Sequence, residues 1–199
     1  MSMALPDPAA SLDAHAWIAA AYAHGQGMLL VLNRDGVDAL CRRGKSAFAQ
    51  ALPFTDPPHT LRLIDEMQAA QGIDASALLN AALPRDPILL AEHDEDGTHV
   101  IELHVPLDLA HFPGHFAGAP VVPGAVQMAW ALKLAASRLG TGERCHTMEA
   151  LKFQQLLRPG ASVTLTLRAD HARGKLHFAY RHGEANYSSG RLVWSAAHA

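Results

Sequence analysis

The residues best suited to chemistry lie in one short stretch, HFPGHFAGAPVVPG, at positions 111–124. Its second histidine, His115, is a candidate general base, because imidazole exchanges protons near neutral pH. The stretch ends at Gly124, where an apolar helix is expected to begin. Backbone N–H groups at a helix N-terminus stabilise negative charge, and a glycine leaves the approach to them open. The spacing therefore predicts a base and an anion-stabilising amide on neighbouring parts of the chain.

Other interpretations of the histidines stay open. The chain has thirteen histidines, and most of them cannot take part in catalysis. His115 could therefore be a hydrogen-bonded structural residue of the loop. His111 is expected at the surface or at the mouth of a tunnel.

An α+β pattern surrounds this stretch in the second part of the chain, residues 86–199. THVIELHVP alternates between polar and apolar residues and predicts a half-buried strand over 98–106. The segment 125–139 is almost uncharged, which predicts a helix that other elements wrap. Four strand-like runs separated by turns follow, at 148–157, 161–170, 175–183 and 188–196. We expect one central helix followed by an antiparallel meander.

The fixed residues of the stretch resemble the signature of the hotdog-fold 3-hydroxyacyl-(acyl carrier protein) dehydratases. That signature runs G-H-F-P-x-x-P-x-x-P-G-V and continues, four residues on, with Glu or Asp. The matching positions are Gly114, His115, Phe116, Pro120, Pro123 and Gly124. The resemblance is strongest to the branch found in aryl polyene and xanthomonadin-type pigment pathways, and it covers residues 86–195. Positions typical of that branch are Val105, Pro106, Leu109, Phe112, Gln127, Trp130 and Ala131.

The resemblance implies a fold and an activity. The fold is α+β, a hotdog in which a curved antiparallel sheet wraps a central helix, preceded by a small α+β domain. The activity is loss of water from 3-hydroxyacyl or polyenoyl thioesters on the phosphopantetheine arm of an acyl carrier protein, in pigment or fatty-acid-like biosynthesis. By this resemblance His115 removes the C2 proton, Gly124 binds the thioester oxygen, and Met128 and Trp130 are core residues or acyl-tunnel walls. The residues that shape the site loop are Gly114, Phe116, Pro120 and Pro123.

The chain departs from the family at the general acid. The family's carboxylate falls at position 129, where this chain has Ala129, and no Asp or Glu occurs between Phe116 and Gly142. General acids and bases contribute about 10²–10⁴ in rate, so a self-dimer of this chain is expected to be a poor dehydratase. Gln127 could hold a substituting water, but two residues along a helix lie about 200° apart around its axis. Its side chain is therefore expected to point away from position 129.

Three functions are compatible with these residues. In the family one subunit supplies the base and its partner the acid. The chain is therefore expected to be a dehydratase subunit in a homodimer, or in a heterodimer with another hotdog protein. The second function is a non-catalytic partner that binds acyl thioesters or the carrier protein. The third is a hotdog thioesterase, because the same helix N-terminus can polarise a thioester toward water. No cofactor is expected, and no metal, because the histidines lack supporting ligands at metal-binding spacing.

The pattern of residues 1–85, the first part of the chain, predicts a small α+β domain. The expected elements are a helix over 11–23, a strand over 28–33, a turn at 34–36, a helix over 36–52, a strand over 60–65 and a helix over 74–83. This order resembles the small C-terminal subdomain of adenylate-forming acyl ligases. The loop lysine of that subdomain falls near Asp74 here, so adenylation is not expected. We interpret this part as a remnant or a docking module, with an unrelated cap domain as the alternative.

Composition excludes several classes of function. The chain has 199 residues, of which 49% are hydrophobic and 18% charged, so it can bury a core. A formal charge of −3 provides no basic field for nucleic acid. Cys41 and Cys145 match neither a disulfide framework nor a zinc ligand set, which favours the cytoplasm. No apolar run approaches the ~20 residues of a membrane span.

Overall fold

The computed structural model describes residues 12 and 14–194, and the chain divides into two compact units. Unit 1 is Met1–Arg85 together with Pro106–Pro120, and unit 2 is Asp86–Val105 together with Val121–Ala199. The predicted boundary between residues 85 and 86 is the point where the chain first passes from unit 1 to unit 2. Residues 106–120, which the sequence assigns to the second domain, belong instead to unit 1.

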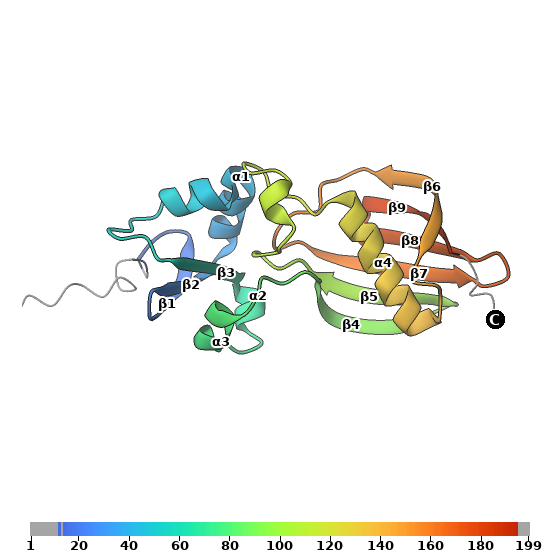
Figure 1. Ribbon diagram of the computed structural model, residues 1–199, viewed down its shortest axis with the longest axis horizontal. Coiled ribbons are helices and arrows are strands. Elements are labelled where there is room, and N and C mark those ends of the chain that lie inside the picture. The colour runs from blue at the N-terminus through green and yellow to red at the C-terminus, as the bar shows by residue number, and fades with distance from the viewer. Residues whose placement is uncertain (1–11, 13, 195–199) are drawn as a thin grey trace, which may run out of the picture. The chain divides into compact units, whose positions relative to one another are not determined.

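Unit 2 consists of one long helix and a six-stranded antiparallel sheet. The strands are β4 (Ile88–Glu95), β5 (Thr98–His104), β6 (Cys145–Phe153), β7 (Ser162–Asp170), β8 (Lys175–His182) and β9 (Ala185–Trp194). They are ordered β4-β5-β7-β8-β9-β6. The helix, α4 (Gly124–Leu139), lies across one face of this sheet (Figure 1). The helix and the antiparallel sheet are as expected, but the four strands after the helix do not form a simple meander, because β6 pairs with β9 and not with β7. Strand β4 is an additional strand that the sequence pattern does not predict.

The core of unit 2 lies between α4 and the sheet. Alternate residues of β7 point toward the helix, as the two-residue period of a strand requires. The buried apolar side chains of β7 and α4 include Val163, Leu165, Leu167, Trp130, Ala131 and Leu134. Other elements do not wrap α4 on every side, however: Ala125, Ala129 and Lys133 are exposed in the single chain. Their spacing of four residues makes one exposed stripe along the helix.

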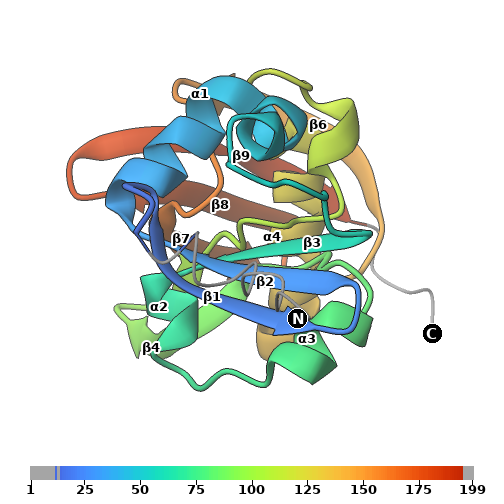
Figure 2. The same ribbon diagram turned by 90° about the vertical axis from the view of Figure 1, so that its left-hand side faces the viewer.

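Unit 1 is built on a three-stranded sheet. Its elements are β1 (Ile18–His24), β2 (Gly27–Leu32), α1 (Arg34–Gln50), β3 (Thr60–Asp65), α2 (Glu66–Ala69), α3 (Ala75–Asn80) and the 3₁₀ turn η1 (Phe112–Gly114). Strand β1 is antiparallel to β2, and β2 is parallel to β3 with α1 as the crossover. Figure 2 shows α1 on one side of the sheet and α2 and α3 on the other.

The side chains of β2 alternate between two cores, one on each face of this sheet. Met28, Leu30 and Leu32 pack with α1, and this core also contains Leu107 from the second segment of unit 1. Leu29 and Val31 point to the opposite face, where α2 and α3 cover them. A single strand therefore carries both cores, which explains why MLLVLN is apolar at every position but the last.

Two local predictions for unit 1 are wrong. The helix predicted over 11–23 is strand β1 from Ile18 onward, because pairing with β2 outweighs the helix preference of its alanines. Ser11 and Asp13, at the start of that predicted helix, lie outside the described residues. The turn predicted at 34–36 is the first turn of α1. Asn33 caps that helix, since its Oδ1 accepts a hydrogen bond from the Gly36 N–H at 3.0 Å.

Candidate functional site

The predicted base, His115, lies in the loop 106–120, which packs with unit 1. It directly follows η1, and its N–H donates to the Phe112 carbonyl at 3.0 Å. The loop is tied to the N-terminal segment where the Ala110 N–H donates to the Pro84 carbonyl at 2.8 Å. The His115 side chain is exposed, and none of the described residues hydrogen-bonds its ring. The imidazole is thus accessible on a loop with an anchored backbone.

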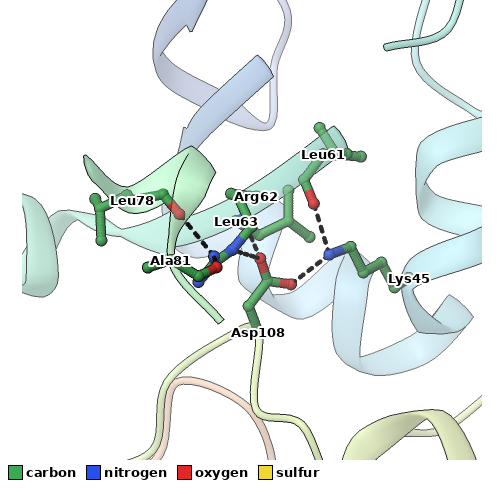
Figure 3. A network of polar contacts seen from close by, with 7 residues as sticks. All are labelled: Lys45, Leu61, Arg62, Leu63, Leu78, Ala81 and Asp108. Atoms are coloured by element: carbon green, nitrogen blue, oxygen red, sulfur yellow. Dashed lines mark hydrogen bonds and ion pairs between the residues drawn. The ribbon is translucent and has the colours of Figure 1, made fainter. Parts of the chain in front are cut away.

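Asp108 is the strongest anchor of this loop (Figure 3). Its side chain is only 3% exposed, and its Oδ2 accepts from the Leu63 N–H at 2.7 Å and from Arg62 Nε at 3.1 Å. Its Oδ1 accepts from Lys45 Nζ at 2.6 Å. One buried carboxylate from the His115 loop is therefore held by two cations and a backbone amide of the N-terminal segment. The sequence pattern does not predict a role for Asp108, because its partners are distant along the chain.

The two cations that hold Asp108 are themselves fixed by backbone carbonyls. Arg62 Nη1 donates to the carbonyls of Leu78 and Ala81 at 2.7 and 2.9 Å, which joins the end of α3 to β3. Lys45 Nζ donates to the Leu61 carbonyl at 2.7 Å. Charge-assisted bonds of this kind are about twice as strong as neutral ones. The anchor therefore links α1, β3, α3 and the loop into one network (Figure 3).

A glycine in α1 allows the loop to lie close to that helix. Gly44 has φ 72° and ψ 163°, which breaks the helical geometry and kinks α1. A Cβ at this position would overlap the carbonyl of Ala117 in the loop. The helix predicted over 36–52 is confirmed, but its glycine marks a contact with the loop.

The loop and α1 together enclose a pocket of about 380 Å³ within unit 1. Most of its lining is apolar, with Leu40 from α1 and Phe112 and Pro120 from the loop. Phe116, which follows the predicted base directly, is a further lining residue. Four of the six predicted motif positions, Gly114, His115, Phe116 and Pro120, thus lie on a loop that borders a pocket.

The last two motif positions, Pro123 and Gly124, form the start of α4 in unit 2. Pro123 is the N-cap and makes no side-chain capping bond, and no described residue accepts a hydrogen bond from the amide of Gly124. A Cβ on Gly124 would lie 2.6 Å from the ring of Phe153 on β6. Glycine is therefore required here by a close aromatic neighbour as well as by access to the amide.

Gln127 does not orient a water toward position 129. Its side chain is buried, with Nε2 donating to the Val122 carbonyl at 3.0 Å and Oε1 accepting from Ser188 Oγ at 2.6 Å. Its backbone carbonyl accepts from the Tyr180 hydroxyl at 2.8 Å. Burial raises the pKa of Tyr180, which keeps this donor protonated. These bonds fix the first turn of α4 to the sheet and leave no polar end of Gln127 free.

The side chains around position 129 divide between the core and the surface. Met128 and Trp130 are buried, 9% and 3% exposed, whereas Ala129 lies on the exposed stripe of α4. Burial is compatible with a core role or a tunnel wall for Met128 and Trp130, so the tunnel remains a prediction. The position of the missing acid, in contrast, is open to another molecule.

Within the described part of the chain, no helix is both long and apolar enough to cross a membrane. Among the same residues, no group of three or more His, Cys, Asp or Glu side chains could hold a metal ion.

Comparisons with known proteins place the similarity in the second part of the chain. Residues 91–191 match the ApeI-like family, described as ApeI dehydratase. A search of curated proteins returned no match. Among solved structures, the dehydratase heterocomplex ApeI:P from Xenorhabdus doucetiae is 28% identical over 54% of this chain and 96% of its own, with a TM-score of 0.50. This similarity confirms the hotdog fold.

Two further structures are similar to the same share of the chain. An uncharacterized protein from Erwinia carotovora subsp. atroseptica is 33% identical over 56% of this chain and 97% of its own, with a TM-score of 0.49. The dehydratase domain of PpsC from Mycobacterium tuberculosis, in complex with C12:1-CoA, is 22% identical over 58% of this chain and 46% of its own, with a TM-score of 0.42.

Proposed function

Because the chain belongs to the ApeI-like dehydratase family, we propose that it is one half of a composite dehydratase acting on 3-hydroxyacyl thioesters. The observation that carries the proposal is the contrast between two positions. His115 is exposed on an anchored loop, whereas the position of the family's acid is Ala129 on an exposed helical stripe. The base is present, and the acid must come from a second chain that packs against this stripe.

The proposed reaction divides its proton transfers between two chains. By the resemblance to the dehydratases, the role of the His115 imidazole is to take the proton from C2 of the thioester. The role of the N-terminal amide of α4 at Gly124 is to stabilise the negative charge that develops on the thioester oxygen. A carboxylic acid of the partner gives its proton to the C3 hydroxyl, which leaves as water while the C2–C3 double bond forms. His115 then carries one proton and the partner carboxylate has lost one, so a transfer between them restores the site.

The proposed partner is a second hotdog protein that carries Glu or Asp on its central helix. The ApeI:P structure is itself described as a heterocomplex, which supports a mixed pair for this chain as well. We propose a substrate carried on the phosphopantetheine arm of an acyl carrier protein. The resemblance to the aryl polyene and xanthomonadin branch supports a polyenoyl or aryl-polyenoyl chain as the acyl group.

The test is dehydration of a 3-hydroxyacyl carrier-protein thioester by this chain, alone and co-purified with an acid-bearing hotdog partner. We expect slow formation of the 2-enoyl product by the chain alone and rapid formation by the mixed complex, measured by mass spectrometry of the carrier protein. His115→Ala should return the mixed complex to the slow rate. His111→Ala is the matched control, because His111 belongs to the same loop and bonds the Arg85 carbonyl through Nε2 at 3.2 Å.

Three results would contradict the proposal, each in a different way. Dehydration by the chain alone that survives His115→Ala would reject His115 as the base. Release of free acid and thiol would identify a thioesterase. Tight binding of the thioester without turnover, in every complex, would identify a non-catalytic acyl-thioester or carrier-protein binder.

A further inference from the structure

None of the functions predicted from the sequence assigns a role to the pocket of unit 1. Its volume of about 380 Å³ falls within the range of about 300–1,000 Å³ that is typical of small-molecule sites. Its walls come from both segments of the unit, with Leu40 and Leu83 from the first segment and Leu109 and Phe112 from the second. The N-terminal part of the chain and the His115 loop therefore build one cavity together.

The charge of the pocket favours an apolar occupant. Among the described residues that line it, Lys45 and Asp108 alone are charged, and they are bonded to each other at 2.6 Å. Asp108 is also paired with Arg62, so the carboxylate is neutralised and is not available to a cationic ligand. An ionic head group would find no free countercharge here, whereas a hydrocarbon chain would meet an apolar surface.

The mouth of the pocket exposes large apolar side chains that a ligand would cover. Phe116 is 66% exposed and Leu83 is 37% exposed, although both line the pocket. Phe116 follows His115 directly in the chain. The centroids of the two rings are 6.2 Å apart, so a molecule with its apolar part in the pocket would have its other end near the imidazole.

We propose that this pocket binds the distal, apolar part of the acyl chain whose thioester end is presented to His115. The inference rests on the proposed function and adds a role for residues 1–85, which supply the part of the pocket wall that limits the length of the acyl chain. Apolar contacts far from the reacting atoms hold the substrate in place for the base. Substrate length would then be selected by the N-terminal part of the chain and not only by the hotdog.

The test uses acyl-pantetheine amides, which are inert to hydrolysis and dehydration, with saturated chains from four to ten carbons. Dissociation constants for the full chain are measured by calorimetry, with pantetheine alone as the baseline. Each buried methylene should tighten binding about fourfold until the pocket is full. Ser46→Trp places a large side chain at an exposed lining position of α1. It should weaken the binding of the longest acyl chains by at least about tenfold and leave the affinity for the shortest chains unchanged.

Ala47→Trp is the matched control, since Ala47 is the next residue on α1, is also exposed and does not line the pocket. This variant should bind every acyl-pantetheine amide of the series with the same affinity as the unchanged chain. Affinity independent of chain length, or equal effects of the two tryptophans, would overturn the proposal. This experiment measures binding only, so it is independent of turnover. If affinity rises with acyl-chain length but no complex dehydrates the substrate, the proposed function is rejected and the pocket assignment stands.

Discussion

Replacing Ala129 by glutamate should convert the chain alone into a dehydratase, with turnover of a 3-hydroxyacyl pantetheine thioester rising about 10²–10⁴-fold. The resemblance to the dehydratases places a carboxylate at this position, and the structure shows that the position is exposed on α4. Glutamate is a good helix former and needs no burial there, so the variant should fold. The single change supplies the proton donor for the departing hydroxyl, which the self-dimer otherwise lacks.

The control for this gain is Ala125→Glu. Ala125 lies one turn earlier on the same exposed stripe, so glutamate there adds the same charge to the same helix face without occupying the acid position. The rate of enoyl product formation by each purified variant gives the comparison. Equal rates for the two variants, or no gain in Ala129→Glu, would contradict the assignment of position 129 as the vacant acid site.

Asp108→Asn should release the His115 loop from the N-terminal segment. The substitution keeps the shape of the side chain and removes its charge, which leaves the buried Arg62 guanidinium, 8% exposed, without a counterion. Removing one partner of a buried ion pair costs about 3–5 kcal/mol. Loss of the Lys45 pair adds little to this cost, because the Lys45 side chain is 42% exposed and its charge is screened by solvent. The amides of residues 106–120 should therefore exchange with deuterium much faster in the variant, as hydrogen-exchange mass spectrometry would detect.

Asp86→Asn provides the comparison for Asp108→Asn. Asp86 pairs with Lys133 at 2.6 Å within unit 2, but both side chains are more than half exposed. Exposed pairs contribute about 0–1 kcal/mol, so this variant should leave exchange in the loop unchanged. Unaltered exchange in Asp108→Asn as well would show that Asp108 does not hold the loop.

Features that follow from local pattern could be predicted from the sequence. The alternation of β7 and the uncharged run of α4 gave their positions to within one residue at each end. The spacing of His115 and Gly124 placed one on a loop and the other at the first position of a helix. These features depend on residues a few positions apart, where strand and helix periods act directly.

Features that depend on distant partners could not be predicted in this way. Asp108 bonds Arg62 and Lys45, which lie 46 and 63 residues earlier in the chain. No local period connects these positions, so neither the anchor nor the assignment of the loop to unit 1 follows from pattern. Gln127 shows the same limit, because Ser188 is 61 residues away and determines what its side chain can do.

Two strands were obscured by their own composition. Strand β1 is rich in alanine, which favours a helix until pairing with β2 is considered. Strand β4 has the acidic run EHDE in its second half, which is typical of a solvated segment. It lies at one edge of the sheet, with β5 as its one neighbour, and charged residues are common on such edges. In both cases the neighbouring strand, and not the segment itself, determines the conformation.

The central claim is that the base and the acid of one site belong to different chains, and trans-complementation tests it most directly. The unchanged chain has His115 and no acid, and the double variant His115→Ala, Ala129→Glu has the acid and no base. Co-expressed with different tags and purified through both, their mixed dimer should dehydrate the substrate at about half the rate of the Ala129→Glu homodimer, because one site of two is complete. The claim would be contradicted if the mixed dimer were as inactive as each of its components alone while the Ala129→Glu homodimer was active.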